Sequence, residues 1–346
     1  MRIALEGDDG AYDWSSFTIT CFVDAALNDV FDLWSTSEGV RRFWADDVKC
    51  IKPDATRRAD DETFEIGDRV GLRFPTDTET SLEILNIEQD RFILFSFGED
   101  YGWVRVMVDR AGDRTRIELR QFGLPVEADS AWHVHANARG WWIANLLNIK
   151  SVLGHGNDLR VRQPAVASGL ATRFAPNGKA AASHDWSSFD TFLYYQAKPE
   201  DVIRYWQTTS GLEQFFIAGA FTESTDGSSR DPNDVMQGND QYAWRFIHPF
   251  ELTGIIQEVT SDSTAFTFGA GYEVRVAVKA SGDGTLLHLH QSGMQDTPDE
   301  RVAGSLNCRS CWIYFLVNLK SVIEHGVDLR DMNPETADSV SVGYNR

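Results

Sequence analysis

The sequence has few cysteines and no long apolar run. Its four cysteines, Cys21, Cys50, Cys308 and Cys311, do not recur at matching places in the repeat described below, so they give no shared disulfide framework. The opening ten residues are acidic and too short in apolar side chains for a typical secretory signal. No segment reaches the ~18 consecutive apolar residues that a membrane-spanning helix needs. These absences predict a cytoplasmic protein with no membrane partner.

Positive charge is also scarce. The chain of 346 residues carries 32 Lys and Arg against 52 Asp and Glu, which gives a net charge of −20. Such a charge repels nucleic acid and anionic membrane surfaces, so neither is expected as a partner. The sequence also lacks a P-loop, a dinucleotide-binding glycine fingerprint, an HExxH pair and a nucleophile elbow. We therefore predict no cofactor and no metal, and no residue is singled out as catalytic.

Aromatic side chains and an internal repeat are what the sequence does have. The 11 Trp and 21 Phe favour a large core or an aromatic-lined cavity. Residues 140–160, GWWIANLLNIKSVLGHGNDLR, return as CWIYFLVNLKSVIEHGVDLR at 311–330. DWSSF at 13–17 likewise returns at 185–189. A repeat of this kind indicates a duplicated structural unit.

The repeat predicts the domain organisation. Two domains are expected at residues 11–162 and 184–332, packed on each other as an internal pseudo-dimer. The segment between them, 163–183, is rich in Pro, Ala, Gly and Ser and is typical of a linker. Residues 333–346 are expected to form a loosely ordered tail.

Both copies show the same order of expected elements. Near the start of the first copy, Phe17, Ile19, Cys21 and Val23 alternate with mostly polar neighbours, as in a half-buried strand. Two short helices, a series of antiparallel strands and one long helix follow, and a Gly-Asp turn joins the last two strands of each copy. Because the strands are grouped and the helices lie outside the group, the pattern predicts an α+β fold.

The long C-terminal helix has one constant and one variable side. The constant stripe is apolar in both copies and is expected to pack on the sheet. In the first copy its members are Trp142, Leu146, Ile149 and Leu153. In the variable stripe, Trp141 and Asn145 of the first copy become Cys311 and Phe315 in the second. Both helices end in His-Gly, which predicts a left-handed glycine cap.

The helix-end pattern allows a comparison with a known family. Trp-x5-Asn-Leu/Ile-Lys-Ser-Val-Leu/Ile-x-His-Gly-x-Asp-Leu-Arg, at the end of this order of elements, resembles the module homologous to the C-terminal domain of the Hsp90 ATPase activator. That module belongs to the START/Bet v 1-like (SRPBCC) superfamily. The resemblance covers nearly all of both copies and implies a helix-grip fold, in which a curved antiparallel sheet wraps the long helix and leaves a cavity. It also implies binding of hydrophobic small molecules or cyclase-like catalysis.

Aromatic and small residues expected near the gap between helix and sheet are the candidate ligand-binding residues. They are Trp44, Phe97, Trp103, Trp141 and Asn145 in the first copy, and Phe216, Phe268, Tyr272, Cys311 and Phe315 in the second. Complete filling of the core by the same side chains is the competing interpretation. The amide of Asn145 needs a partner on a mostly apolar helix face, and a ligand or water can supply it. We therefore predict a polar-anchored pocket in the first copy and a filled second copy.

The Cys308-x-x-Cys311 pair would share a helix face, as a redox or metal pair does. Ala138 and Trp141 stand at these positions in the first copy, and the sequence has no second such pair. We therefore expect the two cysteines to line the core or the cavity.

Two histidine pairs were weighed as further candidates. His288 and His290 lie on one face of a strand and could hold a metal with a nearby carboxylate. Because the leucines that alternate with them form the natural inward pair, we expect these histidines to face solvent without a metal. His133 and His135 do not converge on a helix, so they are expected to be structural or to lie at a pocket rim.

Taken together, the sequence predicts a protein that binds a small hydrophobic ligand without turnover, mainly in the first domain. One alternative is a cyclase- or hydrolase-like enzyme that uses polar groups of the same cavity as acid and base. The other is a protein-interaction module that contacts a chaperone or another partner. A buried titratable group in the cavity favours the enzyme, and an exposed apolar patch favours the interaction module.

Overall fold

The computed structural model describes residues 12–97, 101–126, 131–162, 185–247, 250–269 and 271–333. The chain divides between residues 184 and 185 into two compact units, unit 1 and unit 2, and each is described by itself. The expected linker at 163–183 and the tail beyond residue 333 lie outside the described residues.

Each unit contains strands, two short helices and one long helix in the expected order. Unit 1 contains β1 (Ser16–Val23), α1 (Leu27–Ser35), α2 (Ser37–Phe43), β2 (Asp47–Ile51), β3 (Arg69–Arg73), β4 (Glu79–Glu88), β5 (Phe92–Ser96), β6 (Trp103–Ala111), β7 (Arg114–Phe122) and α3 (Ala131–His155). Unit 2 contains β8 (Ser188–Tyr195), α5 (Pro199–Gln207), α6 (Thr209–Phe215), β9 (Gly219–Glu223), β10 (Gln241–Arg245), β11 (Glu251–Val259), β12 (Ser263–Phe268), β13 (Tyr272–Ser281), β14 (Gly284–Ser292), α7 (Pro298–Glu300), the π-helix η1 (Arg301–Asn307) and α8 (Cys308–His325).

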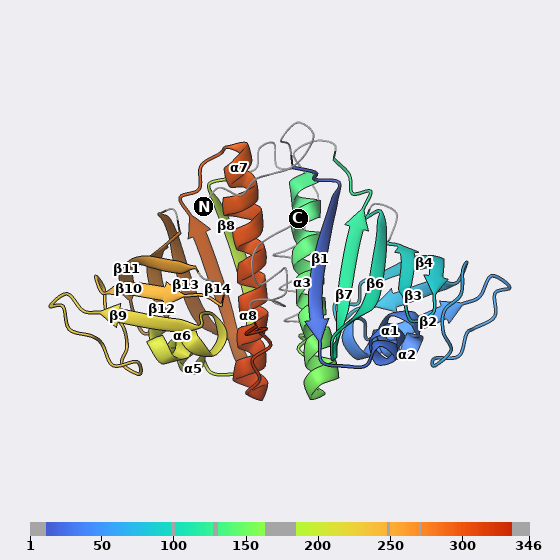
Figure 1. Ribbon diagram of the computed structural model, residues 1–346, viewed down its shortest axis with the longest axis horizontal. Helices are drawn as coiled ribbons and strands as arrows, with labels where there is room; N and C mark the ends of the chain where they lie inside the picture. Colours follow the sequence, from blue (N-terminus) through green and yellow to red (C-terminus); the bar gives the residue numbers. More distant parts are fainter. Residues whose placement is uncertain are drawn as a thin grey trace. The chain divides into compact units, whose positions relative to one another are not determined.

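Each unit has one 7-stranded sheet in which neighbouring strands run antiparallel. The strand order is β1-β7-β6-β5-β4-β3-β2 in unit 1 and β8-β14-β13-β12-β11-β10-β9 in unit 2. Because the first strand pairs with the last, the long helix that follows the last strand lies along β1 or β8 (Figure 1). The first short helix contacts the middle strands, β5 to β7 or β12 to β14. This is the helix-grip arrangement, and the predicted α+β class is confirmed. None of the described helices is both long and apolar enough to cross a membrane.

The apolar pattern explains why the long helix lies on the sheet. Along β1, side chains alternate between partly exposed and buried, and Phe17, Ile19 and Cys21 point into the core. On α3, Trp142 is fully buried, as the constant stripe predicts. Its indole Nε1 donates to Oε1 of Gln121 on β7 at 2.7 Å, and unit 2 repeats this bond between Trp312 and Gln291 at 2.7 Å. A tryptophan that is both apolar and hydrogen-bonded fixes the position of the helix along the sheet.

The end of α3 is tied to α2 by one side-chain amide. Nδ2 of Asn148 donates to the carbonyl of Phe43 at 2.9 Å, and its Oδ1 accepts from the backbone N–H of Leu159 at 2.7 Å. Asp158 and Arg160 add an ion pair, and the Arg160 guanidinium donates to carbonyl oxygens at the end of α2 and just after it. Asn148 is 2 % exposed, so both of its backbone partners are buried groups that need a bond.

Unit 2 repeats this arrangement. Asn318 donates to the carbonyl of Phe215 at 2.9 Å and accepts from Leu329 N–H at 2.7 Å. Arg330 donates to the carbonyls of Ile217 and Glu213 at 2.9 and 2.7 Å. The best-repeated stretch of the sequence is therefore the part that joins the long helix to the second short helix, and its polar residues are used in that joint. Gly326 adopts φ 70°, which confirms the predicted glycine cap.

A buried ion pair anchors the long connection between the second and third strands of each unit. The Arg58 guanidinium donates to both carboxylate oxygens of Asp68 at 2.6 and 3.2 Å, and the two residues are 1 % and 0 % exposed. In unit 2, Arg230 and Asp240 make the same contact at 2.6 and 2.7 Å. A buried pair ten residues apart has no periodic signal, so the sequence pattern does not reveal it.

The second long helix differs from the first. α3 is continuous, whereas in unit 2 the π-helix η1 precedes α8, which the sequence did not predict. The Tyr272 hydroxyl donates to Oε2 of Glu300 at 2.7 Å beside this stretch. A Cβ at Gly304 would lie 2.8 Å from that carboxylate oxygen and 3.1 Å from the Tyr272 hydroxyl, so a larger residue there would require the Glu300 side chain to shift.

Replacing Asn148 with Ala tests the joint between the helices. We expect the free energy of unfolding of unit 1 to fall by about 2 kcal/mol or more, because the Phe43 carbonyl and the Leu159 N–H lose their partner while buried. Urea unfolding followed by tryptophan fluorescence measures the change. Asn28→Ala, on the exposed side of α1, is the matched control and should shift the value by less than about 0.5 kcal/mol. Similar losses in both variants would contradict the assignment.

Candidate functional site

Aromatic rings from three parts of unit 1 meet in the gap between α3 and the sheet. The Trp44 ring centroid lies 5.6 Å from that of Trp141 and 5.9 Å from that of Phe97, and Trp141 and Phe97 lie 5.5 Å apart. We call this group, together with the buried rings of Trp34, Phe43, Phe95 and Trp142, the aromatic cluster. Its members are Trp34, Phe43, Trp44, Phe95, Phe97, Trp141 and Trp142. Three of the predicted site residues are thus brought together.

The indole of Trp44 is buried in this cluster without a hydrogen-bond partner. The residue is 3 % exposed, and among the described residues no acceptor reaches its Nε1. A buried donor left without an acceptor costs about 1–3 kcal/mol. Unit 2 has Phe216 at this position, which removes the donor. Trp34 and Trp206 also have unpaired indoles, but they occupy the same place in both units and so belong to the shared core.

Unit 2 has one further unpaired indole, that of Trp244. The Trp244 ring is 0 % exposed and lies 3.8 Å from the Tyr242 ring, which is stacked on it. Trp44 differs because two of its ring neighbours, Phe97 and Trp141, are only half-buried. The unpaired N–H of Trp44 therefore lies one ring from solvent.

Asn145 lies on the buried side of α3, at 8 % exposure. Its Nδ2 donates to the carbonyl of Trp141 in the same helix at 2.8 Å. The amide thus has a partner within the protein, and the expectation that a ligand or a water supplies its partner is wrong. Asn145 stands between Trp141, whose ring contacts Trp44, and Asn148, which bonds Phe43. It therefore adds a polar group beside the cluster, where Phe315 stands in unit 2.

The placement of Trp103 in the gap was wrong. Trp103 is 44 % exposed and packs against Phe122, whereas its neighbour Val104 is fully buried. Successive side chains of a strand point to opposite faces, so an error of one residue in the register moves a side chain to the other face. Tyr272, at 8 % exposure, corresponds in unit 2 to Gly102 and not to Trp103.

The predicted residues of unit 2 are only partly brought together. The Phe216 ring lies 4.9 Å from Phe315 and 6.4 Å from Phe268, and Trp312 packs against it at 5.1 Å. Phe246, which the sequence reading missed, adds a ring at 5.4 Å. Phe216 and Phe315 are buried, whereas Phe246 and Phe268 are half-buried.

Two other predicted positions of unit 2 lie away from these rings. Tyr272 is bonded to Glu300, and Cys311 is half-buried one turn before Phe315. Burial raises the pKa of the Cys308 thiol to about 12, and the two cysteines form no disulfide. A thiol with so high a pKa does not supply a reactive thiolate near neutral pH.

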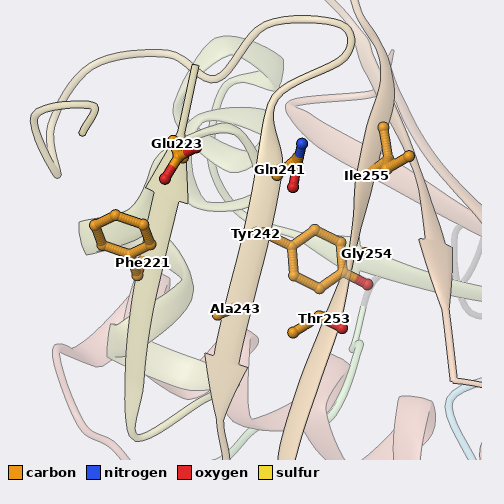
Figure 2. Close-up of a pocket in the computed structure, with 8 residues that line it drawn as sticks. All are labelled: Phe221, Glu223, Gln241, Tyr242, Ala243, Thr253, Gly254 and Ile255. Carbon is orange, nitrogen blue, oxygen red and sulfur yellow. The ribbon is translucent and has the colours of Figure 1, made fainter. Parts of the chain in front are cut away.

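A hollow of about 450 Å³ lies on the outer face of the unit 2 sheet, and not in the gap where a pocket was expected. It is lined by Phe221, Glu223, Gln241, Tyr242, Ala243, Thr253, Gly254 and Ile255. Figure 2 shows the Tyr242 ring reaching from β10 towards Gly254 on β11. The matching positions of unit 1 hold Val70 and Leu82. Unit 2 therefore has a larger side chain on the first strand of this pair, Tyr242, and a glycine on the second, Gly254.

His135 is a structural histidine. It is 0 % exposed, and its Nδ1 lies 2.9 Å from the Trp14 carbonyl while its Nε2 lies 3.0 Å from the Tyr12 hydroxyl. The carbonyl can only accept, so Nδ1 carries the proton and the Tyr12 hydroxyl donates to Nε2. Burial lowers the pKa of His135 to about 4. In unit 2, Ser305 makes the corresponding bond to the Trp186 carbonyl at 3.1 Å, so this position joins the start of the first strand to the long helix.

Comparison with known proteins gives structural neighbours only. No known family pattern and no curated protein matches the chain. Protein SSP2350 from Staphylococcus saprophyticus is 18% identical, with 41% of this chain and 94% of that chain covered and a TM-score of 0.34. The Aha1 dimer from Colwellia psychrerythraea is 11% identical, with 41% and 98% covered and a TM-score of 0.33. DynU16, a putative protein in the dynemicin biosynthetic locus, is 11% identical, with 90% and 98% covered and a TM-score of 0.33. These values carry no argument about activity.

The low pKa of His135 predicts a pH-dependent stability of unit 1. The folded pKa of about 4 lies below the unfolded value of about 6.5, so the unfolded chain binds a proton first as the pH falls. The contribution of neutral His135 is complete above about pH 6.5 and is lost between about pH 6.5 and 4. His135→Ser copies unit 2. The stability advantage of the wild type over this variant should shrink by about 2 kcal/mol between pH 7 and 5, measured by urea unfolding. An advantage that stays constant or grows would overturn this assignment.

Proposed function

We propose that unit 1 binds a small, largely apolar molecule between α3 and the sheet, without chemical turnover. The observation that carries this proposal is the indole N–H of Trp44, which is buried among aromatic rings with no acceptor in reach among the described residues. A ligand oxygen placed there would satisfy the donor in a site of low polarity, where a hydrogen bond is strong. The ligand is therefore an apolar molecule with at least one hydrogen-bond acceptor.

The walls of the site narrow the ligand class further. Trp44, Phe97 and Trp141 present ring faces at centroid separations of 5.5–5.9 Å, which suits a flat, unsaturated molecule that stacks on them. Phe97 and Trp141 are half-buried and stand between Trp44 and solvent. Because the rings fill the gap, these two side chains must rotate to admit the ligand.

The chemistry of the lining supports binding over catalysis. The described members of the aromatic cluster are Trp and Phe side chains, and Asn145 beside them is an amide. None of these groups takes up or releases a proton near neutral pH, as a general acid or base must. His135, a buried titratable group of unit 1, has both ring nitrogens engaged by the Tyr12 hydroxyl and the Trp14 carbonyl.

We also infer that both units belong to the Hsp90 ATPase activator-like branch of the START/Bet v 1-like superfamily, in a cytoplasmic protein. The support is the helix-end motif, in which Asn148, Asp158 and Arg160 recur as Asn318, Asp328 and Arg330 with the same bonds. A repeated set of side-chain to backbone bonds is a stronger family character than the order of elements alone.

A contact with a chaperone or another protein is the second candidate function, and one feature favours it. Phe221 and Ile255 at the outer hollow of unit 2 are 48% and 45% exposed. Exposed apolar side chains beside a hollow are typical of interaction surfaces. Loss of partner binding in Phe221→Asp, with ligand binding by unit 1 unchanged, is the outcome that would support it.

Trp44→Phe tests the ligand proposal. The variant copies Phe216 of unit 2 and keeps the ring but removes the donor. We expect the affinity for an environment-sensitive naphthyl ketone to fall about tenfold, which corresponds to the loss of one buried hydrogen bond. Fluorescence titration measures it. Urea unfolding of the free variant is measured alongside, because loss of the unsatisfied donor favours the folded state whereas the smaller ring leaves a cavity that disfavours it.

Trp103→Phe, on the outer face of the same sheet, is the matched control and should leave the ketone affinity unchanged. Equal affinity of wild type and Trp44→Phe would contradict the proposed anchor. Native mass spectrometry of the chain purified from its own host then identifies the natural ligand. A co-purifying lipophile that Trp44→Phe retains less well supports the proposal.

A further inference from the structure

Three side chains that can bind a metal meet on the outer face of the unit 2 sheet. Asp190 lies on β8, and His288 and His290 lie on the neighbouring strand β14. Oδ1 of Asp190 is 2.6 Å from Nε2 of His288 and 3.0 Å from Nδ1 of His290. One ligand atom of each residue lies within 4.8 Å of the other two, and no other group of three such residues occurs in the part of the chain that the structure describes.

We propose that Asp190, His288 and His290 form a binding site for a divalent transition metal ion of the Zn²⁺ type. Two neutral imidazole nitrogens and one carboxylate oxygen are the donor set that such ions prefer over Mg²⁺ or Ca²⁺. Zn²⁺ binds these atoms at about 2.0–2.2 Å, which places neighbouring ligand atoms roughly 3–3.5 Å apart. The observed separations reach that range after small side-chain rotations.

The strand pairing holds the three residues in place before any metal arrives. Asp190 is directly opposite His290 in the antiparallel ladder, and Phe192 is opposite His288. Because His288 and His290 are two residues apart on one strand, their side chains leave the same face. The Phe192 ring stacks on the His288 ring at 4.4 Å and 12°, which limits its rotation. The folded sheet therefore already holds the three ligands close together, which lowers the conformational entropy lost when a metal ion binds.

The surroundings suit a bound cation. The side chains of all three residues are 40–49% exposed, so water can complete the coordination shell of an ion held by three protein ligands. Arg275 is opposite His290 on β13, and its charge is paired with Glu258 at 2.7 Å.

Unit 1 provides an internal comparison. The positions that match Asp190, His288 and His290 hold Thr18, Glu118 and Arg120, and Arg120 brings a positive charge to the same place. At these positions unit 1 has one possible metal ligand, Glu118, so the outer face of its sheet forms without a set of three. The three residues are therefore a feature of unit 2 and not of the shared scaffold.

The test is a zinc titration of the full chain without a histidine tag, after removal of metals with a chelator. Zn²⁺ is titrated near neutral pH in competition with a chromophoric chelator, and we expect one equivalent bound by the wild type. The triple variant Asp190→Thr, His288→Glu, His290→Arg copies the surface of unit 1 and should bind at least about tenfold more weakly, the lower end of the loss seen for the outer partners of metal ligands. Circular dichroism and thermal unfolding confirm that it folds.

His155→Ala removes an exposed histidine at the end of α3 and is the control for adventitious binding. It should keep the wild-type affinity. A wild type that binds no more tightly than the triple variant, or an equal loss in His155→Ala, would overturn the proposal. Loss confined to the triple variant supports it.

Discussion

One buried amide at the end of each long helix holds the helix-grip unit together. Asn148 and Asn318 each bond a carbonyl at the end of the second short helix and an N–H of the chain that leaves the long helix. Each amide thus joins its long helix to the second short helix, about a hundred residues earlier in the sequence, and to the chain just after the long helix. Apolar packing places the helix on the sheet, but it has no direction along the helix axis. The amide adds a second fixed point to the bond between the helix tryptophan and the sheet glutamine, which explains why this stretch is so well preserved in the repeat.

With the joint held constant, the two units differ in the gap and on the outer face. In the gap, Trp44 and Asn145 of unit 1 are replaced by Phe216 and Phe315, so an unpaired donor and an amide become rings. On the outer face, a threonine of unit 1 is replaced by Asp190, which lies between two histidines. Neither change involves Asn148 or Asn318, the residues that join the helices. The two copies can therefore differ in their binding sites and still keep the same fold. The proposed functions follow these differences.

The fold could be predicted largely from the sequence, and the site only in part. Alternation along Phe17 to Val23 and the apolar stripe of the long helix are local signals, and they gave the α+β class and the order of elements. Trp103 was misplaced because strand register is set by pairing with distant residues, which a single strand does not encode. The carboxylate beside His288 comes from Asp190, far away in sequence, and the partner of Asn145 lies within its own helix. The Asp190 pairing depends on tertiary geometry, so no periodic pattern reveals it, whereas the bond of Asn145 is local to one helix turn.

The proposed ligand site of unit 1 depends on the Trp44 indole N–H as its hydrogen-bond donor. Nuclear magnetic resonance of the ¹⁵N-labelled indole groups, with and without the naphthyl ketone, tests it most directly. The account predicts that the Trp44 indole proton moves to lower field and exchanges more slowly with solvent when the ketone binds, while the indole of Trp244 in unit 2 is unchanged. Binding of the ketone with the Trp44 signal unmoved, or with the main shifts at Trp103 on the outer face, would contradict the account.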